Sequence, residues 1–314
     1  SLYLGTPSFP TTNIGKTQST GIDASLSYDT TIGKDFNIST NLNFTTSDNE
    51  VLEINNGDRY IWGAGYGIPY TPIVRFEEGF SPGYFFGYKT DGIFQSQAEV
   101  NSHATQNGAA PGDIRFVDVN SDGIINDSDR TEIGDPFADF TIGWNLAVDY
   151  KNFDFSTLID AKIGGDLHSM SYSWGRYAGV LEETLYGRET GIIGNGVISD
   201  GNGGYVPNNV VVTAKAYNQR AFSNSVEESA IFDASYVKWR SLSIGYNLSE
   251  KLLKGTFLSA AKLSLVGRNL AILHRNVPHI DPETGFSSAN GEQGQEFGQL
   301  PSTRSIGMNI NLKF

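Results

Sequence analysis

The last ten residues of the chain, 305–314, alternate without interruption between two kinds of side chain. Apolar residues occupy positions 306, 308, 310, 312 and 314, and small or polar residues occupy the positions between them. A period of two places successive side chains on opposite faces of a β-strand. The stretch therefore predicts a strand with one apolar face and one polar face, which ends on the aromatic residue Phe314. Taken alone, this pattern also fits an ordinary amphipathic strand.

Six further stretches alternate in the same way, so the chain is expected to contain about seven strands. They are residues 17–32, 36–44, 140–150, 153–163, 231–248 and 258–273. In residues 231–248 the alternation changes phase near Trp239, which predicts a β-bulge there. The polar faces carry small, hydrophilic side chains such as Asn37, Ser39, Asn41 and Asn43, which suit a wet lumen better than a protein core.

The connections between these stretches alternate in length. Short turns alternate with long irregular segments at about 49–136, 164–229 and 274–300. Such a meander is typical of a membrane barrel with short periplasmic turns and long extracellular loops, and strands of ten to eighteen residues suit a tilted span. The predicted fold class is therefore all-β, a transmembrane antiparallel β-barrel. In such a barrel a terminal aromatic such as Phe314 belongs to an interfacial girdle.

Composition limits the function classes. The net charge is −13 with a pI of about 4.7, so no basic stripe is available to neutralise nucleic-acid phosphates. The chain has no cysteine, which excludes disulfides and thiolate metal sites. No apolar run is long enough for a transmembrane helix. The chain does not start with Met, and seven is an odd number of strands for a bacterial barrel, so we expect a processed or partial chain.

One acidic segment, residues 118–129, has the spacing of a twelve-residue calcium loop. Oxygen ligands fall at positions 1, 3, 5, 7 and 12 of the loop, and a glycine at position 6 allows the sharp turn. The predicted ligands are Asp118, Asn120, Asp122, the backbone carbonyl of Ile124, and Asp129. Position 12 is Asp instead of the usual Glu, and its shorter side chain weakens bidentate closure. The alternative is a solvated turn; with calcium, the site would be structural.

The long loops carry exposed aromatic candidates for holding a substrate: Tyr60, Trp62, Tyr66, Tyr172, Trp174 and Tyr177. Aromatic rings stack on sugars or grip a peptide, but the same rings also pack loops against one another or against a partner. No Gly-x-Ser-x-Gly elbow and no P-loop is present, and no carboxylate pair with catalytic spacing is found. We therefore predict no enzyme activity and no catalytic residues.

Four stretches, in order along the chain, resemble the TonB-dependent receptors. Residues 13–23 are similar to the strand entry of that superfamily, and three others are similar to its SusC/RagA branch, the outer-membrane nutrient importers of Bacteroidetes. These are residues 85–94, Phe-Phe-Gly-Tyr-Lys-Thr-Asp-Gly-Ile-Phe; residues 111–136, which include the calcium-like loop; and residues 233–246 with Gly267-Arg268-Asn269-Leu270 and Asp281-Pro282-Glu283. Together they span nearly the whole chain.

The resemblance implies the C-terminal third of a barrel of about 22 strands that is closed by an N-terminal plug. It implies a multi-pass protein of the cell outer membrane that imports a glycan oligomer or an oligopeptide. It also implies a SusD-like surface lipoprotein as partner and energy from TonB, reached through the N-terminal part that this chain lacks. An alternative is a secreted, calcium-stabilised β-domain that binds glycans. An outer-membrane enzyme with its site on the loops would need clustered catalytic residues that the loops do not offer.

Overall fold

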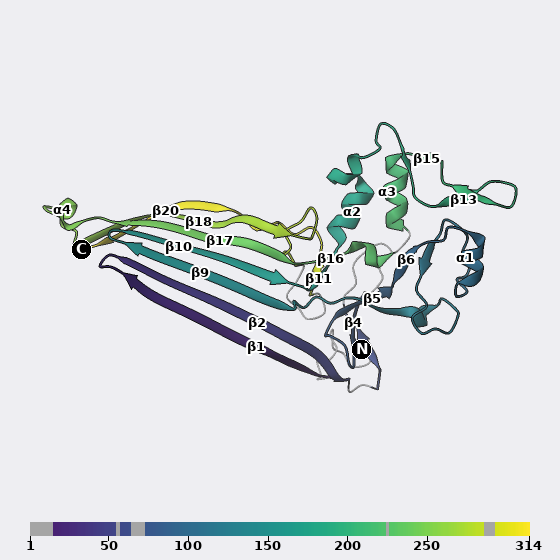
Figure 1. Ribbon diagram of the computed structural model, residues 1–314, viewed down its shortest axis with the longest axis horizontal. Helices are drawn as coiled ribbons and strands as arrows, with labels where there is room; N and C mark the ends of the chain where they lie inside the picture. The colour runs from purple at the N-terminus through teal and green to yellow at the C-terminus, as the bar shows by residue number, and fades with distance from the viewer. Residues whose placement is uncertain (1–14, 55–56, 64–72, 224–225, 286–292) are drawn as a thin grey trace, which may run out of the picture.

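The computed structural model describes residues 15–54, 57–63, 73–223, 226–285 and 293–314. A long seven-stranded antiparallel sheet forms one end of the molecule, and smaller sheets and helices form the other (Figure 1). The order across the sheet follows the chain, as a meander. Its strands are β1 (Gly15–Ile32), β2 (Phe36–Ile54), β9 (Phe140–Tyr150), β10 (Phe153–Ile163), β17 (Tyr236–Asn247), β18 (Ala260–Arg275) and β20 (Ser305–Lys313).

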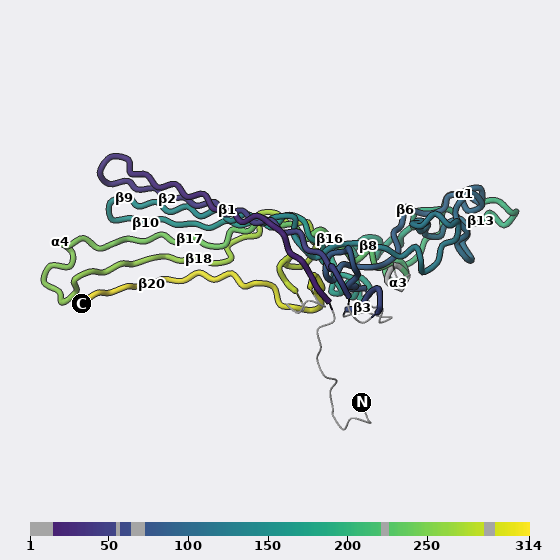
Figure 2. The backbone as a smooth tube through the Cα atoms, turned by 90° about the horizontal axis from the view of Figure 1, so that it is seen from below, coloured from purple at the N-terminus to yellow at the C-terminus, as the bar shows by residue number. Residues whose placement is uncertain are grey.

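The sheet is an open, curved wall in the described part of the chain, and β1 and β20 each pair with a single neighbour (Figure 2). The predicted strand count and the antiparallel meander are therefore confirmed. The second strand is longer than predicted and continues to Ile54, because the register with β1 persists through polar residues that read as loop. The predicted strand 231–248 is interrupted at Ala234 and Ser235, and its first piece joins another sheet.

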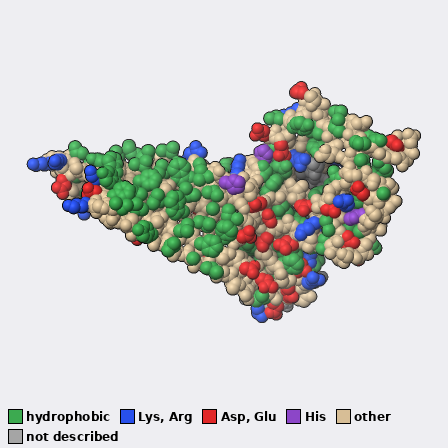
Figure 3. Space-filling model, viewed as in Figure 1, with side chains coloured by type: hydrophobic (Ala, Val, Ile, Leu, Met, Phe, Trp, Pro, Cys, Tyr) green, Lys and Arg blue, Asp and Glu red, His purple; other side chains and the backbone are tan. Residues whose placement is uncertain are grey.

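The two faces of the sheet differ sharply in chemistry. One cross-strand row on the outer face joins six strands through apolar residues only: Ile38, Val148, Phe155, Ile244, Leu265 and Met308. The adjacent row on the inner face is polar or small: Asn37, Asp149, Asp154, Gly245, Ser264 and Asn309. Figure 3 shows the resulting expanse of hydrophobic side chains over the sheet. An apolar face of this size needs an apolar environment.

Aromatic residues gather at the end of the sheet where the connections are short. Phe36, Tyr150, Phe153 and Tyr246 form one cross-strand row through four strands. Nearby, the Phe314 ring stacks on the Phe257 ring, with centroids 5.6 Å apart. This arrangement matches the aromatic girdle that was predicted from Phe314. The short connection between β17 and β18 contains one helical turn, α4 (Glu250–Leu253).

A register shift between Trp239 and Ser241 confirms the predicted bulge in β17. On the side of the bulge toward the short turns, Leu242 and Ile244 pair with Thr157 and Phe155 on the outer face. On the side toward the long loops, Trp239 pairs with Ile159 on that same face. The outer positions are therefore odd-numbered there, and the neighbouring Lys238 points to the inner face. One extra residue thus moves the charged side chains beyond the bulge from the outer face to the inner face of the sheet.

The long connections are folded and contain short elements. The first holds β3 (Tyr60–Trp62), β4 (Val74–Glu77), β5 (Tyr84–Tyr88), β6 (Thr90–Ile93), α1 (Gln97–Ser102), β7 (Ile114–Phe116), η1 (Asp127–Asp129) and β8 (Arg130–Gly134). The second holds β11 (Asp166–Ser169), α2 (Met170–Ala178), η2 (Glu182–Leu185), β12 (Ile192–Ile193), β13 (Val197–Ser199), β14 (Tyr205–Pro207), β15 (Val211–Val212), α3 (Ala214–Ser223), η3 (Glu227–Ala230) and β16 (Ile231–Asp233). The third holds β19 (Gln295–Glu296).

Helices α2 and α3 were not foreseen, because glycine-rich turns dominate the sequence around them. Helix α2 begins where Ser169 Oγ accepts a hydrogen bond from the Tyr172 N–H, and it ends at Gly179 in the left-handed region. Two apolar clusters form the core at this end, and the more deeply buried one is centred on Val74 and Phe85. Within the described residues, no helix is both long enough and apolar enough to cross a membrane.

An ionic cluster fastens the last loop to the inner side of the wall. Lys238 Nζ donates to Asp281 and, at 2.5 Å, to Glu283 Oε2. Arg240 bonds both Glu283 and Asp160, the latter at 2.5 Å. Burial alone would raise the pKa of Asp281, but hydrogen bonds from Lys238 and from Ser302 outweigh it and lower that pKa to about 2. The Asp281 carboxyl is therefore ionised at neutral pH.

We expect Lys238→Met to lower the free energy of unfolding by about 3–5 kcal/mol, because it leaves the buried Asp281 carboxylate without its cation. Lys262→Met is the matched control on the next strand. Lys262 pairs with Asp154 at 2.8 Å but is more exposed, so its loss costs about 0–1 kcal/mol. Urea unfolding in detergent, followed by tryptophan fluorescence, measures both. Equal losses in the two variants would contradict the structural role of the cluster.

Candidate functional site

The predicted calcium loop folds as a compact turn in the first long connection. Asp118 Oδ2 accepts from the Gly123 N–H at 2.9 Å, and Asp122 Oδ1 accepts from the Ile124 N–H at 2.8 Å. Asn120 Oδ1 accepts from the Asp122 N–H at 2.9 Å. Gly123 has a φ of +82°, which is the sharp turn that its position in the motif requires. Four of the predicted ligands therefore sit on one tight loop, as their spacing indicates.

Asp129, the fifth predicted ligand, closes the loop. Its side chain is fully buried, and its two carboxylate oxygens accept from the Val119 N–H at 3.0 Å and the Asn126 N–H at 2.8 Å. Asp118 Oδ1 is buried and has no hydrogen-bond partner among the described residues. A buried carboxylate oxygen without a donor is unfavourable unless a cation satisfies it. The donor chemistry of the loop thus fits a hard cation.

The carboxylates alone do not form a preformed metal cluster. In the described ranges there is no group of three or more His, Cys, Asp or Glu side chains placed to hold a metal ion. The predicted set contains three carboxylates, and its other ligands are the Asn120 amide and the Ile124 carbonyl. That carbonyl accepts a hydrogen bond from Asn126 Nδ2 at 3.2 Å. Calcium remains an expectation for this loop.

Two of the predicted substrate aromatics, Tyr60 and Trp62, line one recess of about 500 Å³ in the first long connection. We name it the aromatic–arginine recess, because the Arg75 guanidinium carbon lies 3.7 Å from the Tyr60 ring centroid and 4.0 Å from that of Phe86. Arg75 Nη2 also pairs with the buried Glu77 at 3.0 Å. The two aromatics are about two-fifths exposed, so each offers ring surface while it packs on its neighbours.

Trp174 and Tyr177 line a second recess, of about 670 Å³, between α2 and α3. We name it the helix-pair recess. It shares no lining residue with the aromatic–arginine recess. The structure therefore separates the predicted aromatics into two places instead of one platform. Phe85, the first residue of the 85–94 segment that resembles the family, is fully buried and belongs to the core.

Tyr172 does not line either recess. Its ring packs edge-on against Phe232 and stacks near His279. Burial raises the pKa of Tyr172 to about 12, and a hydrogen bond to Glu183 adds to the rise. Tyr172 thus packs one loop on another, which is the alternative reading of these aromatics. Tyr66 lies outside the described residues.

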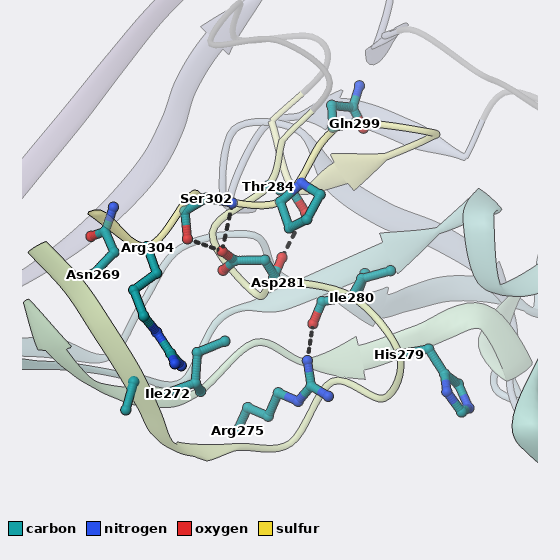
Figure 4. Close-up of a pocket in the computed structure, with 12 residues that line it drawn as sticks. Asn269, Ile272, Arg275, His279, Ile280, Asp281, Thr284, Gln299, Ser302 and Arg304 are labelled. Atoms are coloured by element: carbon teal, nitrogen blue, oxygen red, sulfur yellow. Dashed lines mark hydrogen bonds between the residues drawn. The ribbon is translucent and has the colours of Figure 1, made fainter. Parts of the chain in front are cut away.

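A third recess, of about 390 Å³, lies beside the ionic cluster and is lined by the last loop and by β18 (Figure 4). Asp281 sits at its wall, where it accepts from the Ser302 N–H at 3.2 Å. Arg275 Nη1 donates to the Ile280 carbonyl at 2.7 Å. Figure 4 shows the Arg275 and Arg304 side chains reaching this recess from different segments.

The sequence did not identify the charged residues of the ionic cluster or of the aromatic–arginine recess. Lys238 and Arg240 could have been recognised from the sequence, because they are two charged residues on either side of Trp239 within a predicted strand. Asp281 and Glu283 were noted as part of the resemblance but not as their partners. Arg75 and Glu77 carry no such signal, since they lie in an irregular segment and meet Tyr60 only through the fold.

Comparisons with known proteins identify the family. A scan of protein-family models finds no match. The chain is 30% identical over 311 residues to TonB-dependent receptor P3 of Formosa agariphila, and the match covers 96% of the chain and 29% of that protein. It is 24% identical over 313 residues to TonB-dependent receptor P26 of the same organism, covering 96% of the chain and 30% of that protein.

TonB-dependent receptor SusC of Bacteroides thetaiotaomicron is 23% identical over 242 residues, or 76% of the chain and 21% of SusC. Among solved structures, the RagAB peptide transporter superposes with a TM-score of 0.63 at 17% identity, over 96% of the chain and 30% of the matched chain. The open-open state of the RagAB peptide importer gives 0.58 at 19% identity, over 96% of the chain and 29% of the matched chain. These structures share the fold.

The chain thus spans between 21% and 30% of the length of these relatives. Its seven-stranded wall, its long loops at one end and these similarities agree with the resemblance read from the sequence. The chain belongs to the SusC/RagA-like TonB-dependent receptors.

Proposed function

We propose that this chain forms part of the wall and the substrate-holding loops of an outer-membrane importer for a glycan oligomer or an oligopeptide. In this proposal the parent protein is the SusC-like barrel of a complex with a SusD-like surface lipoprotein, and it is energised through TonB. The remainder of the barrel and the plug complete it. No reaction is catalysed.

The two-faced open sheet is the observation that carries the proposal. Its outer face is apolar across six strands, and its inner face is polar. Both edge strands, β1 and β20, have a side without a partner among the described residues. Exposed edges and an apolar face are liabilities for a secreted domain. They are the expected features of a wall segment that other strands complete and lipid surrounds. This disfavours the secreted glycan-binding domain.

The names of the relatives support the transport role in general terms. SusC and the Formosa proteins are named TonB-dependent receptors, and the RagAB structures are described as those of a peptide transporter or importer. The recesses at the loop end of the wall support substrate contact there, since 500 to 670 Å³ is a common size for a ligand pocket. Glycan and peptide both remain candidate substrates.

We also propose that residues 118–129 bind Ca²⁺ as a structural ion. Asp118, Asn120, Asp122, the Ile124 carbonyl and Asp129 would hold it, and the ion would fix the turn that precedes β8. The buried, unpaired Oδ1 of Asp118 supports this proposal. Asp127, within the loop, accepts a hydrogen bond from the Tyr88 hydroxyl at 3.1 Å, and it also lines the aromatic–arginine recess. The ion would thereby stabilise one wall of that recess.

The wall assignment predicts a contrast between two neighbouring residues of β20. Met308 is about two-thirds exposed on the outer face, and Asn309 lies on the inner face. Met308→Arg in the full-length protein should cost about 2–4 kcal/mol if it lies near the centre of the bilayer, and it should reduce the folded protein recovered from outer membranes several-fold. Asn309→Arg should leave recovery near the wild-type level. Equal recovery of the two variants would contradict a lipid-facing wall.

The calcium proposal predicts a measurable affinity that depends on Asp118. We expect the full-length protein in detergent to bind Ca²⁺ in calorimetry, and Asp118→Asn to weaken binding at least tenfold, because it removes one of three carboxylate ligands. Asp200→Asn is the control, since Asp200 lies in an exposed turn of the second long connection. Calcium binding that is absent, or unchanged in Asp118→Asn, would refute the site.

The import proposal predicts uptake that depends on both the receptor and TonB. Cells are offered fluorescent oligosaccharide and oligopeptide pools, with either the full-length receptor gene or the TonB gene deleted. We expect each deletion to abolish accumulation of the same pool, and purification of the receptor to recover a surface lipoprotein. Uptake of every pool at the wild-type rate in both strains would exclude the importer role.

A further inference from the structure

The helix-pair recess is lined mainly by helical elements of the second long connection. Helices α2 and α3 and the turn η2 supply its walls. Thr184 is almost completely buried within it, and Asn218 Nδ2 is fixed to the Ala214 carbonyl at 2.9 Å. The recess is therefore a shaped part of the folded loop, with a volume of about 670 Å³.

Three cations line the helix-pair recess, and none of its lining residues is acidic. They are Arg176, Arg188 and Lys215. This is unusual in a chain whose net charge is −13. The acidic group that approaches this set is Glu183, whose Oε1 lies 3.9 Å from Arg176 Nε, and it is two-fifths exposed. An ion pair so long and so open neutralises little charge.

Arg188 is held by neutral oxygens, so its charge is not cancelled. Its Nε donates to the Thr184 carbonyl at 2.9 Å, and its Nη2 donates to the Gly179 carbonyl and to Thr184 Oγ1. Lys215 is exposed and makes no ion pair with any described residue. The protein therefore fixes one guanidinium by hydrogen bonds and places an exposed ammonium in the same recess, without an ion-pair partner for either among the described residues. Such a pair is suited to a carboxylate or sulfate of a ligand.

The remaining lining is of the kind that recognises sugars. The rings of Trp174 and Tyr177 meet edge to face, with centroids 5.9 Å apart, and Tyr177 is about two-fifths exposed. Amide and hydroxyl groups of Gln219 and Thr213 complete the wall. Aromatic faces and side-chain amides suit the apolar faces and hydroxyls of pyranose rings. Among the described residues that line the recess, most lie on α2, η2 or α3 and none lies in a strand, so they offer no strand edge on which a peptide could pair its main chain.

We propose that the helix-pair recess binds an acidic oligosaccharide, one that carries carboxylate or sulfate groups. Arg188 and Lys215 contact the anionic group, and Trp174 and Tyr177 contact the adjoining sugar ring. This inference rests on the proposed importer function, and it assigns that importer an anionic glycan instead of a neutral glycan or a peptide.

The test is binding to the full-length protein in detergent, measured by calorimetry with four probes. Oligogalacturonate hexamer and a chondroitin sulfate hexasaccharide are the acidic probes, maltohexaose is the neutral sugar, and hexaglutamate is the acidic peptide. We expect an acidic oligosaccharide to bind at least tenfold more tightly than maltohexaose and hexaglutamate. Its affinity should fall with rising salt, because solvent-exposed charges are screened.

The charge-removing variant is Arg188→Gln with Lys215→Gln. It should weaken binding of the acidic oligosaccharide at least tenfold. The matched control is Lys251→Gln with Lys254→Gln, which removes two exposed cations at the opposite end of the sheet and should change nothing. Lys215→Gln alone removes an exposed side chain that has no partner in the described ranges, so its expected several-fold loss does not depend on the fold of the recess.

Three results would overturn the inference: no binding of either acidic sugar, equal binding of hexaglutamate with the same dependence on Lys215, or unchanged affinity in the double variant. Receptor-dependent uptake of a neutral glycan or a peptide, together with any of these results, would reject the anionic specificity alone. Loss of receptor-dependent uptake for every pool would reject the importer function itself.

Discussion

The structure depends on continuous backbone pairing across seven strands. In hydrocarbon no water is available to satisfy a free N–H or C=O group, so a membrane-facing strand must find its partners in its neighbours. The registers of this sheet are unbroken close to the short turns. The shifts occur at or beyond the middle of the strands, toward the loops, as between Leu158 and Ile159. The backbone pairing is therefore regular where lipid is expected, and register shifts occur near the start of the long loops.

The bulge in β17 connects this backbone constraint to the loops. The bulge changes which side chains of β17 point to the inner face. Lys238 and Arg240 therefore lie on that face, where they bind the carboxylates of the last loop. A buried ion pair adds little net stability compared with an apolar pair, but it is specific in geometry. We infer that this cluster sets where the last loop lies, and with it the shape of the recess beside Asp281 (Figure 4).

Much of the wall was predictable because period-two alternation is a direct consequence of strand geometry. The seven strands and the bulge near Trp239 followed from local pattern. The boundaries were less predictable. Residues 49–54 look like loop, yet they continue β2 because β1 and the segment around Phe80 provide backbone partners. Pairing with distant segments determines whether such residues form strand or loop. A local sequence pattern carries no information about that pairing.

The loops were predicted only in part, because their structure comes from tertiary contacts. Glycines at 194, 196, 201, 203 and 204 indicated turns, and they concealed the two helices on either side. The aromatic residues stay candidates for substrate contact, and their distribution between two recesses, like the use of Tyr172 in packing, depends on the fold. The calcium-like spacing did predict a tight loop, and its ligation remains a proposal.

The hairpin of β13 and β14 has a consequence for protein display. It lies at the end of the molecule farthest from the sheet (Figure 1), and its turn is held by its own bonds, with Asp200 Oδ1 accepting from the N–H groups of Asn202 and Gly204, both at 2.8 Å. The turn therefore needs no support from the wall. A foreign peptide inserted between Asn202 and Gly203 would stand well clear of the barrel, and it would leave the strand registers untouched. The hairpin is thus a natural position for an epitope or an affinity tag.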